Sequence, residues 1–123
     1  MIQGNYVSYE VSKLLQEKKY NSPTHEYYLN DGRLYHSEFL MTNQQRSDGN
    51  GYSAPCLYEA QRWLRDEHNL NIKVDYDESQ LWGWSIQRCN ERDDYEDNCS
   101  MFNTYEEALN DGIKNALRLI NYD

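Results

Sequence analysis

Two carboxylates two positions apart are the residues whose types and spacing come nearest to a catalytic pair. Asp75 and Asp77 fall on the same side of an alternating stretch, where side chains two residues apart stand side by side. Nucleases and other hydrolases use such pairs to hold magnesium, here together with a histidine. The same alternation is typical of the wet side of a half-buried strand. We favour this second interpretation, so no catalytic or metal-ligating residue is assigned.

The remaining histidines and cysteines add no catalytic motif. His25 follows a proline turn, His36 ends a predicted strand, and His68 ends a predicted helix, where a cation is favoured in any case. The cysteines are odd in number and lack the spacing of a zinc site, which predicts reduced thiols. They are Cys56, Cys89 and Cys99. The sequence has no glycine-rich phosphate loop, nucleophile elbow or metalloprotease helix motif, so we expect no cofactor and lean away from an enzyme.

Aromatic residues are the unusual part of the composition. The chain has 12 Tyr, three Trp and two Phe, which is 14% of its 123 residues. Tyr and Trp are enriched at protein interfaces, which favours a binding role. Trp82 and Trp84 project to one side of their strand, which is either core or, if open, an interaction platform. The candidate interaction surface consists of Tyr28, Tyr35, Tyr76, Trp82 and Trp84.

The charge is acidic, with 21 Asp and Glu against 12 Lys and Arg, net −9. This argues against nucleic acid and anionic membranes as partners, because both are bound through Lys and Arg. The acidity favours solubility, with a DNA-mimicking inhibitor as an alternative. Residues 90–98 are an acidic run without glycine or calcium-loop spacing, so we interpret them as solvated charge. No apolar run begins the chain, which predicts no signal peptide and no membrane span.

The elements that position these residues are three helices and two hairpins in a single domain. A central helix begins at Ser53-Ala54-Pro55 and closes at His68-Asn69. Residues 72–77 and 82–86 alternate as the two strands of a hairpin. The closing helix, residues 104–121, begins with a capping box of Thr104 and Glu107. Gly112 within it marks a close approach to the sheet.

The first half of the chain is predicted in the same way. Residues 1–7 are a loose lead-in, and Ser8 caps a helix that runs to residue 19. Residues 26–36 form a hairpin around a two-residue turn at 31–32, with Leu29 facing Leu34 and Tyr28 facing Tyr35. Residues 40–52 have no hydrophobic period and are predicted to be a long flexible loop.

These elements combine into an α+β fold of order α-ββ-α-ββ-α. Hairpins imply antiparallel pairing, so the strands are expected to form one four-stranded, mainly antiparallel sheet. The helices are expected to pack on one face of that sheet. The other face is either solvated or buried against a partner.

The chain also resembles a known family in short stretches spread over most of its length. They are residues 7–15 (VSYEVSKLL), 27–28 (YY) before a DG-type turn, 52–55 (YSAP), 63–65 (WLR), 105–109 (YEEAL) and 117–120 (LRLI). The family is the abundant set of short proteins found in phages and prophages of Bacteroides-like bacteria. Cys56 departs from the family pattern, in which threonine follows the proline. No activity or functional residue is carried over, but the resemblance implies a mobile-element origin and a cytoplasmic location in bacteria.

The leading functional hypothesis is a non-enzymatic module that binds protein or associates with itself. It depends on the missing catalytic set, the aromatic surplus and the acidity. The alternatives are a magnesium-dependent nuclease or hydrolase that uses Asp75 and Asp77, and an acidic DNA-mimic inhibitor.

Overall fold

The protein mixes helices with antiparallel strands, as predicted, and divides into two compact units, residues 1–56 and 57–123. The computed structural model describes residues 4–46, 49, 51–89, 95–97 and 101–120. The prediction of one four-stranded sheet is not confirmed. Within the described residues there are two three-stranded sheets, one in each unit. The sequence predicts one domain, whereas each unit has its own sheet and its own buried side chains.

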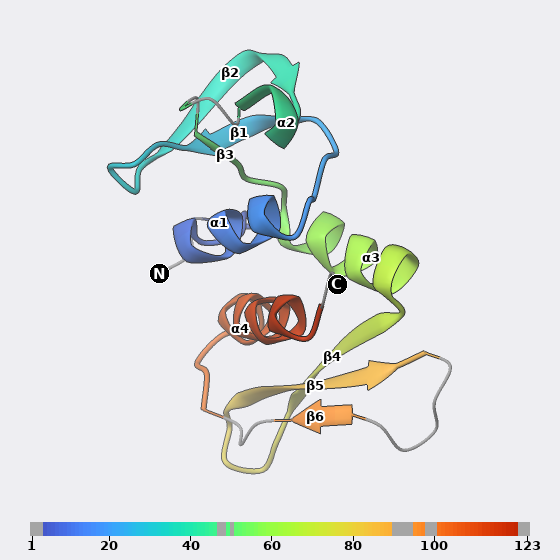
Figure 1. The fold of residues 1–123 in the computed structure, drawn as a ribbon. Helices are drawn as coiled ribbons and strands as arrows, with labels where there is room; N and C mark the ends of the chain where they lie inside the picture. Colours follow the sequence, from blue (N-terminus) through green and yellow to red (C-terminus); the bar gives the residue numbers. More distant parts are fainter. Residues whose placement is uncertain (1–3, 47–48, 50, 90–94, 98–100, 121–123) are drawn as a thin grey trace. The chain divides into compact units, whose positions relative to one another are not determined.

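The first unit contains two helices and a sheet in which β1 is the central strand (Figure 1). In chain order its elements are α1 (Tyr9–Glu17), β1 (Thr24–Tyr28), β2 (Leu34–Met41), α2 (Asn43–Arg46) and β3 (Tyr52–Ser53). The strands are ordered β2-β1-β3 and both pairings are antiparallel. The two edges are therefore the eight-residue β2 and the two-residue β3.

Helix α1 begins as predicted and covers one side of this sheet. The Ser8 hydroxyl accepts a hydrogen bond from the Val11 amide at 3.2 Å, which is the N-cap interaction. The Tyr9 ring packs against Tyr28 and Tyr52, with centroids 5.7 and 6.0 Å apart. The predicted loose lead-in is tied down at its end, because the buried Val7 donates its amide to the Pro55 carbonyl at 3.1 Å.

The register predicted for the first hairpin is wrong by one residue. Tyr28 pairs with Leu34 and Tyr27 with Tyr35, whereas the prediction paired Tyr28 with Tyr35. The predicted two-residue turn needs positive φ at both central residues. Only Gly32 has it, at 76°, and its amide donates to the Leu29 carbonyl at 2.9 Å. The turn is therefore longer, and the register moves with it.

Residues 40–52, predicted as a long flexible loop, contain the end of β2, all of α2 and the first residue of β3. The start of α2 is a capping box: Gln45 N donates to Thr42 Oγ1 at 3.3 Å, and Thr42 N donates to Gln45 Oε1 at 2.8 Å. Gly51, at φ 95°, brings the chain into β3 so closely that a Cβ there would lie 2.4 Å from the Tyr28 carbonyl oxygen. This segment thus forms one edge of the sheet.

The second unit has the helix–hairpin–helix order that the sequence predicts, with one added strand. Its elements are α3 (Leu57–His68), β4 (Leu70–Tyr76), β5 (Trp82–Arg88), β6 (Tyr95–Asp97) and α4 (Tyr105–Arg118). The sheet is antiparallel in the order β4-β5-β6, and α3 and α4 pack on each other and on the sheet. Helix α3 begins later than predicted, because Ser53 belongs to β3 and Pro55 precedes the helix.

The closing helix α4 confirms two local predictions. Thr104 is its N-cap and accepts from Glu107 N at 3.1 Å. A Cβ at Gly112 would lie 2.9 Å from Ile72 Cγ2 and 3.2 Å from Trp84 Cβ, so glycine marks the close approach of helix and sheet. Asn69, at φ 57°, follows α3 in the left-handed conformation that was expected there. Among the described helices, none combines the length and apolar character that a membrane crossing requires.

Candidate interaction surface

The outer edge of β2 exposes two large apolar side chains. Phe39 is 76% exposed and Leu40 is 55% exposed. Figure 1 shows β2 as the outer border of the first unit's sheet, with β1 on its inner side. No strand of the described residues pairs with the other side of β2. We call residues 34–41 with their unpaired side the β2 edge.

The exposure of Phe39 and Leu40 follows from a break in the strand register. Glu26 pairs with His36, but Thr24 pairs with Met41, so residues 37–40 lie opposite a single residue of β1. Such an insertion bends the strand and turns its side chains away from the sheet. Local bonds hold the bulge: His25 Nδ1 donates to the Ser37 carbonyl at 2.9 Å, and Phe39 N donates to Ser37 Oγ at 3.1 Å.

The backbone groups of β2 alternate between β1 and solvent. The Glu26 carbonyl accepts from Ala54 N at 2.9 Å, so Glu26 directs its backbone groups toward β3 and Tyr27 directs its own toward β2. Tyr35, which pairs with Tyr27, therefore points inward. Its neighbours Leu34 and His36 direct their amide and carbonyl groups to the unpaired side. An edge with free backbone groups can pair with another strand.

A buried arginine supports the inner strands. Arg46 is 2% exposed, and its guanidinium lies 4.5 Å from the centre of the Tyr27 ring. Its Nε donates to Ser53 Oγ at 3.1 Å, and its Nη2 donates to the Thr24 carbonyl at 3.0 Å. Burial lowers the pKa of Arg46 from its usual value. The side chain joins α2, β1 and β3 and leaves the outer side of β2 uncovered.

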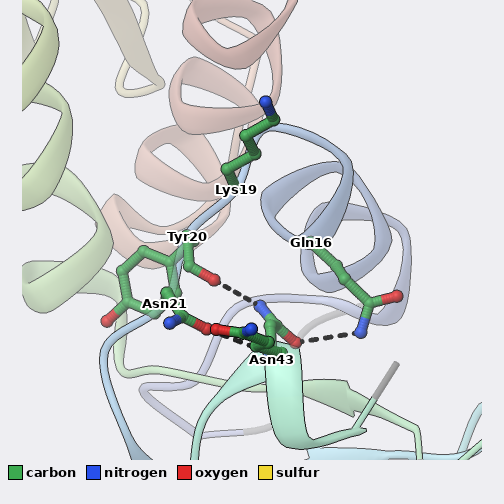
Figure 2. A pocket seen from close by; sticks show the side chains of 6 residues that line it. Gln16, Lys19, Tyr20, Asn21 and Asn43 are labelled. Atoms are coloured by element: carbon green, nitrogen blue, oxygen red, sulfur yellow. Dashed lines mark hydrogen bonds between the residues drawn. The ribbon is translucent and has the colours of Figure 1, made fainter. Parts of the chain in front are cut away.

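A pocket of about 370 Å³ lies between residues of α1 and α2, and Figure 2 shows the carboxamide side chains that line it. Asn43 Oδ1 accepts from Gln16 Nε2 at 3.1 Å and from Ser53 N at 2.8 Å, while Asn43 Nδ2 donates to the Tyr20 carbonyl at 2.9 Å. Asn21 Oδ1 accepts from Gln44 N of α2 at 2.9 Å. These amides hold α2 in place, so we interpret the pocket as part of the scaffold.

Two of the five predicted interaction residues lie in the core, which corrects that prediction. Tyr28 is buried, and its hydroxyl donates to the Val7 carbonyl at 2.7 Å. Trp84 is buried against α4, where its Nε1 donates to Asp111 Oδ2 at 2.8 Å. Both rings serve as core because each ends in a polar atom that finds a partner inside the fold. Burial also raises the pKa of Tyr28.

The other three predicted residues are accessible to different degrees. Tyr35 is half-buried; its ring stacks on Tyr27 with centroids 5.7 Å apart, and its hydroxyl donates to Asp31 Oδ2 at 2.5 Å. Tyr76 is exposed, and its ring packs against that of the half-buried Trp82, with centroids 4.9 Å apart. Their role in binding stays a prediction. Only Tyr35 belongs to the β2 edge.

Of the two carboxylates that suggested a nuclease, Asp75 is exposed and Asp77 holds a turn. Asp75 Oδ2 is exposed and lies 3.9 Å from Lys73 Nζ. Asp77 Oδ1 holds the turn after β4 by accepting from Ser79 N at 2.9 Å. Within the described ranges no group of three His, Cys, Asp or Glu residues could hold a metal ion. The Cys56 side chain is half-buried and that of Cys89 is exposed, while Cys99 lies outside the described residues. Most of the acidic run at 90–98 also lies outside them.

Sequence reasoning missed Phe39 and Leu40 because it ended the second strand at His36. A signal was present: Phe39, Leu40 and Met41 form an uninterrupted apolar run next to a polar segment. The capping box of Thr42 and Gln45 would have placed a helix directly after that run. Together they indicate a longer strand with apolar residues near its end.

Comparisons with protein-family models, with curated proteins and with solved structures found no match. The resemblance to the phage-associated family therefore stays a prediction.

Proposed function

We propose that this protein is a non-enzymatic module that binds protein through the β2 edge. The observation that carries the proposal is an eight-residue edge strand on which Phe39 and Leu40 are 76% and 55% exposed. Soluble proteins normally protect such a strand with charge, proline or a covering element. An edge that remains open and apolar suits the addition of a strand from a partner.

The two parts of the β2 edge would contribute differently to binding. Outward amide and carbonyl groups would form main-chain hydrogen bonds with any extended segment, which gives affinity with little sequence preference. Phe39 and Leu40 would select apolar side chains, and burying a Phe or Leu side chain contributes about 1.5–3 kcal/mol. The proposal needs no catalytic group. A mobile-element origin and a cytoplasmic location remain predictions beside it.

The test is a binding screen with short synthetic peptides of varied sequence, read by fluorescence anisotropy, together with light scattering of the protein alone. We expect an extended peptide, or the protein itself, to bind the wild-type chain. Replacing Phe39 and Leu40 with serine should weaken that binding by about tenfold or more, since each tenfold is about 1.4 kcal/mol. Amide exchange should slow in residues 34–41 on binding.

A matched control removes exposed apolar surface elsewhere. Tyr58 and Met101 are 52% and 61% exposed in the second unit, and replacing both with serine should leave binding unchanged. If the two double variants bind equally well, the β2 edge is not the binding surface. Absence of any peptide binding and of self-association in the wild-type chain would also reject the proposal.

A further inference from the structure

We infer that the second unit has a binding surface of its own, which takes an arginine-bearing segment of a basic protein. The surface consists of three aromatic side chains, Tyr76, Trp82 and Tyr105, which we call the aromatic cluster. In this arrangement a guanidinium group of the partner packs on the rings while acidic residues around them attract it. The inference goes beyond the proposed function, because it concerns the other unit and does not use the β2 edge.

The aromatic cluster lies where the cover of the second sheet ends. Tyr76 and Trp82 are the last register pair before the turn that joins β4 to β5. They share a sheet face with Trp84, which is buried against α4. The Trp82 amide donates to the Phe102 carbonyl at 2.8 Å, and Figure 1 shows the chain entering α4 from this end of the sheet. Because α4 begins only at Tyr105, the last pair of the face stays partly uncovered.

The three rings contact one another through Trp82. Its ring centroid lies 4.9 Å from that of Tyr76, with the planes at 56°, and 5.5 Å from that of Tyr105, with the planes at 80°. Trp82 and Tyr105 are half-buried, whereas Tyr76 is 54% exposed and offers a ring face to solvent. Aromatic faces attract cations, and tryptophan does so most strongly. The cluster therefore combines an accessible tyrosine with the best aromatic acceptor.

Two tyrosines of the first unit show the ligand that such rings take. Lys13 Nζ lies 5.1 Å from the centre of the Tyr9 ring, and the Arg46 guanidinium lies 4.5 Å from that of Tyr27. Among the described residues no Lys or Arg is placed in this way over the aromatic cluster. A cation for these rings would therefore come from a partner.

Acidic residues lie on both sides of the aromatic cluster along the chain. Glu78 is exposed in the turn of the hairpin, and Glu106 and Glu107 follow Tyr105 in the first turn of α4. Burial raises the pKa of Tyr105, and the nearby Tyr58 and Glu106 raise it further, which indicates a negative potential at this ring. The unit as a whole carries fifteen Asp and Glu against seven Lys and Arg, net −8. Such a surface attracts basic partners and repels acidic ones.

The combination of rings and carboxylates favours arginine over other occupants. A guanidinium group is planar and weakly hydrated, so it can stack on an aromatic face while its N–H groups donate to carboxylates. A purely apolar segment would use the rings but gain nothing from the acidic residues. A nucleic acid or a second copy of this unit would be repelled by them. The partner that fits both features is a basic segment with exposed arginine.

A pair of labelled peptides tests the charge requirement. The probe is a fluorescein-labelled peptide of alternating arginine and glycine, and its binding to the full chain is measured by fluorescence anisotropy. The control peptide carries citrulline in place of arginine, which keeps the shape of the side chain but removes its charge. We expect the arginine peptide to bind and the citrulline peptide to bind about tenfold more weakly or less.

A pair of variants tests the site. Tyr76→Leu keeps an apolar side chain and the net charge but removes the most exposed ring, and it should weaken binding of the arginine peptide about threefold to tenfold. Phe39→Leu is the matched control, because it removes a 76% exposed ring from the first unit and should leave the affinity unchanged. Added salt should weaken binding to every variant by screening the acidic residues, while the ratio between wild type and Tyr76→Leu persists.

Four results would overturn the inference. They are no binding of the arginine peptide at low salt, equal binding of the citrulline peptide, equal affinity of Tyr76→Leu and wild type, and a loss of affinity in Phe39→Leu as large as in Tyr76→Leu. The last result would place the peptide on the β2 edge and so support the proposed function instead. Far-ultraviolet circular dichroism checks that both variants are folded.

Discussion

Each of the two units combines helices with a three-stranded antiparallel sheet, but the two units differ in how regularly their strands pair. In the second unit seven consecutive residue pairs join β4 to β5, and the apolar face is covered by α4. In the first unit three consecutive pairs join β1 to β2 before the bulge. The regular hairpin buries Trp84 against α4, whereas the irregular one exposes Phe39 and Leu40. Function is expected where the pattern breaks, because a buried face has no surface left to offer.

Charge divides in the same way. Residues 57–123 carry fifteen Asp and Glu against seven Lys and Arg, net −8, and the first unit carries the remaining −1. A strongly charged surface keeps a protein soluble and repels its own copies. We therefore expect the acidic unit to favour solubility and the nearly neutral unit to tolerate association.

The interiors differ as well. The second unit's core is a contact of α4 with aromatic and aliphatic side chains, whereas the first unit's core contains a buried Arg46 and the carboxamide of Asn43. Polar cores depend on every hydrogen bond being made. We therefore expect single substitutions to have larger effects in the first unit.

The largest effect is expected from Gly51→Ala. The new Cβ would meet the Tyr28 carbonyl oxygen at 2.4 Å, and φ of 95° adds backbone strain. The free energy of unfolding should fall by about 3 kcal/mol or more, with faster amide exchange in residues 24–53. Gly49 is the control: its φ is 92°, but nothing lies within 4 Å of its Cβ position. If Gly49→Ala is equally destabilising, strain rather than the close approach to β1 explains glycine at position 51.

The next largest effect is expected from Arg46→Lys. Its free energy of unfolding, measured by urea denaturation, should be about 2–3 kcal/mol lower than that of the wild-type chain. Lysine keeps the charge but cannot stack flat on Tyr27 while also donating to Ser53 and Thr24. Arg62→Lys is the control in the second unit, because that side chain is 76% exposed and its ion pair contributes little. Equal stability of the two variants would show that the guanidinium does not hold the sheet.

The sequence predicts the second unit better than the first for a physical reason. Alternation in residues 72–77 and 82–86 specifies which face is buried, and the capping box at Thr104 and Asn69 after α3 are local signals that need no tertiary information. In the first unit the hairpin register depends on the conformation of Asp31. Burial of Arg46 depends on residues distant in sequence, so no local pattern predicts it.

The sequence indicates an aromatic binding surface but not which residues form it. Aromatic surplus indicates binding, but which rings are exposed is decided by packing. Tyr28 and Trp84 are buried because each finds a hydrogen-bond partner in the core, whereas Phe39 lies in a bulge that has no sequence signature of its own.

A smaller effect is expected from Gly112→Ala in the second unit. Alanine is favoured over glycine in a helix by about 1 kcal/mol, but its Cβ would lie 2.9 Å from Ile72 Cγ2. We expect a net loss of about 1–2 kcal/mol, since crowding in a packed core outweighs the propensity. The double variant with Ile72→Ala should lose less than the sum of the single losses. A gain in stability for Gly112→Ala would show that α4 can move away from the sheet at little cost.

The smallest effects are those of pH on stability. The second unit should lose stability at acid pH and the first unit at alkaline pH. Burial lowers the pKa of His68 from its usual value of 6.5, so the unfolded chain takes up this proton first as the pH falls. The second unit should therefore lose stability from about pH 6.5 downward, and His68→Gln should remove that part of the loss.

Burial raises the pKa of Tyr28 from its usual 10.0, so the first unit should lose stability as the pH rises above 10. Because Trp63, Trp82 and Trp84 all lie in the second unit, tryptophan fluorescence should follow the acid effect, and amide exchange in residues 24–53 should follow the alkaline one. An acid loss that persists in His68→Gln would assign the effect to the carboxylates of the acidic unit instead.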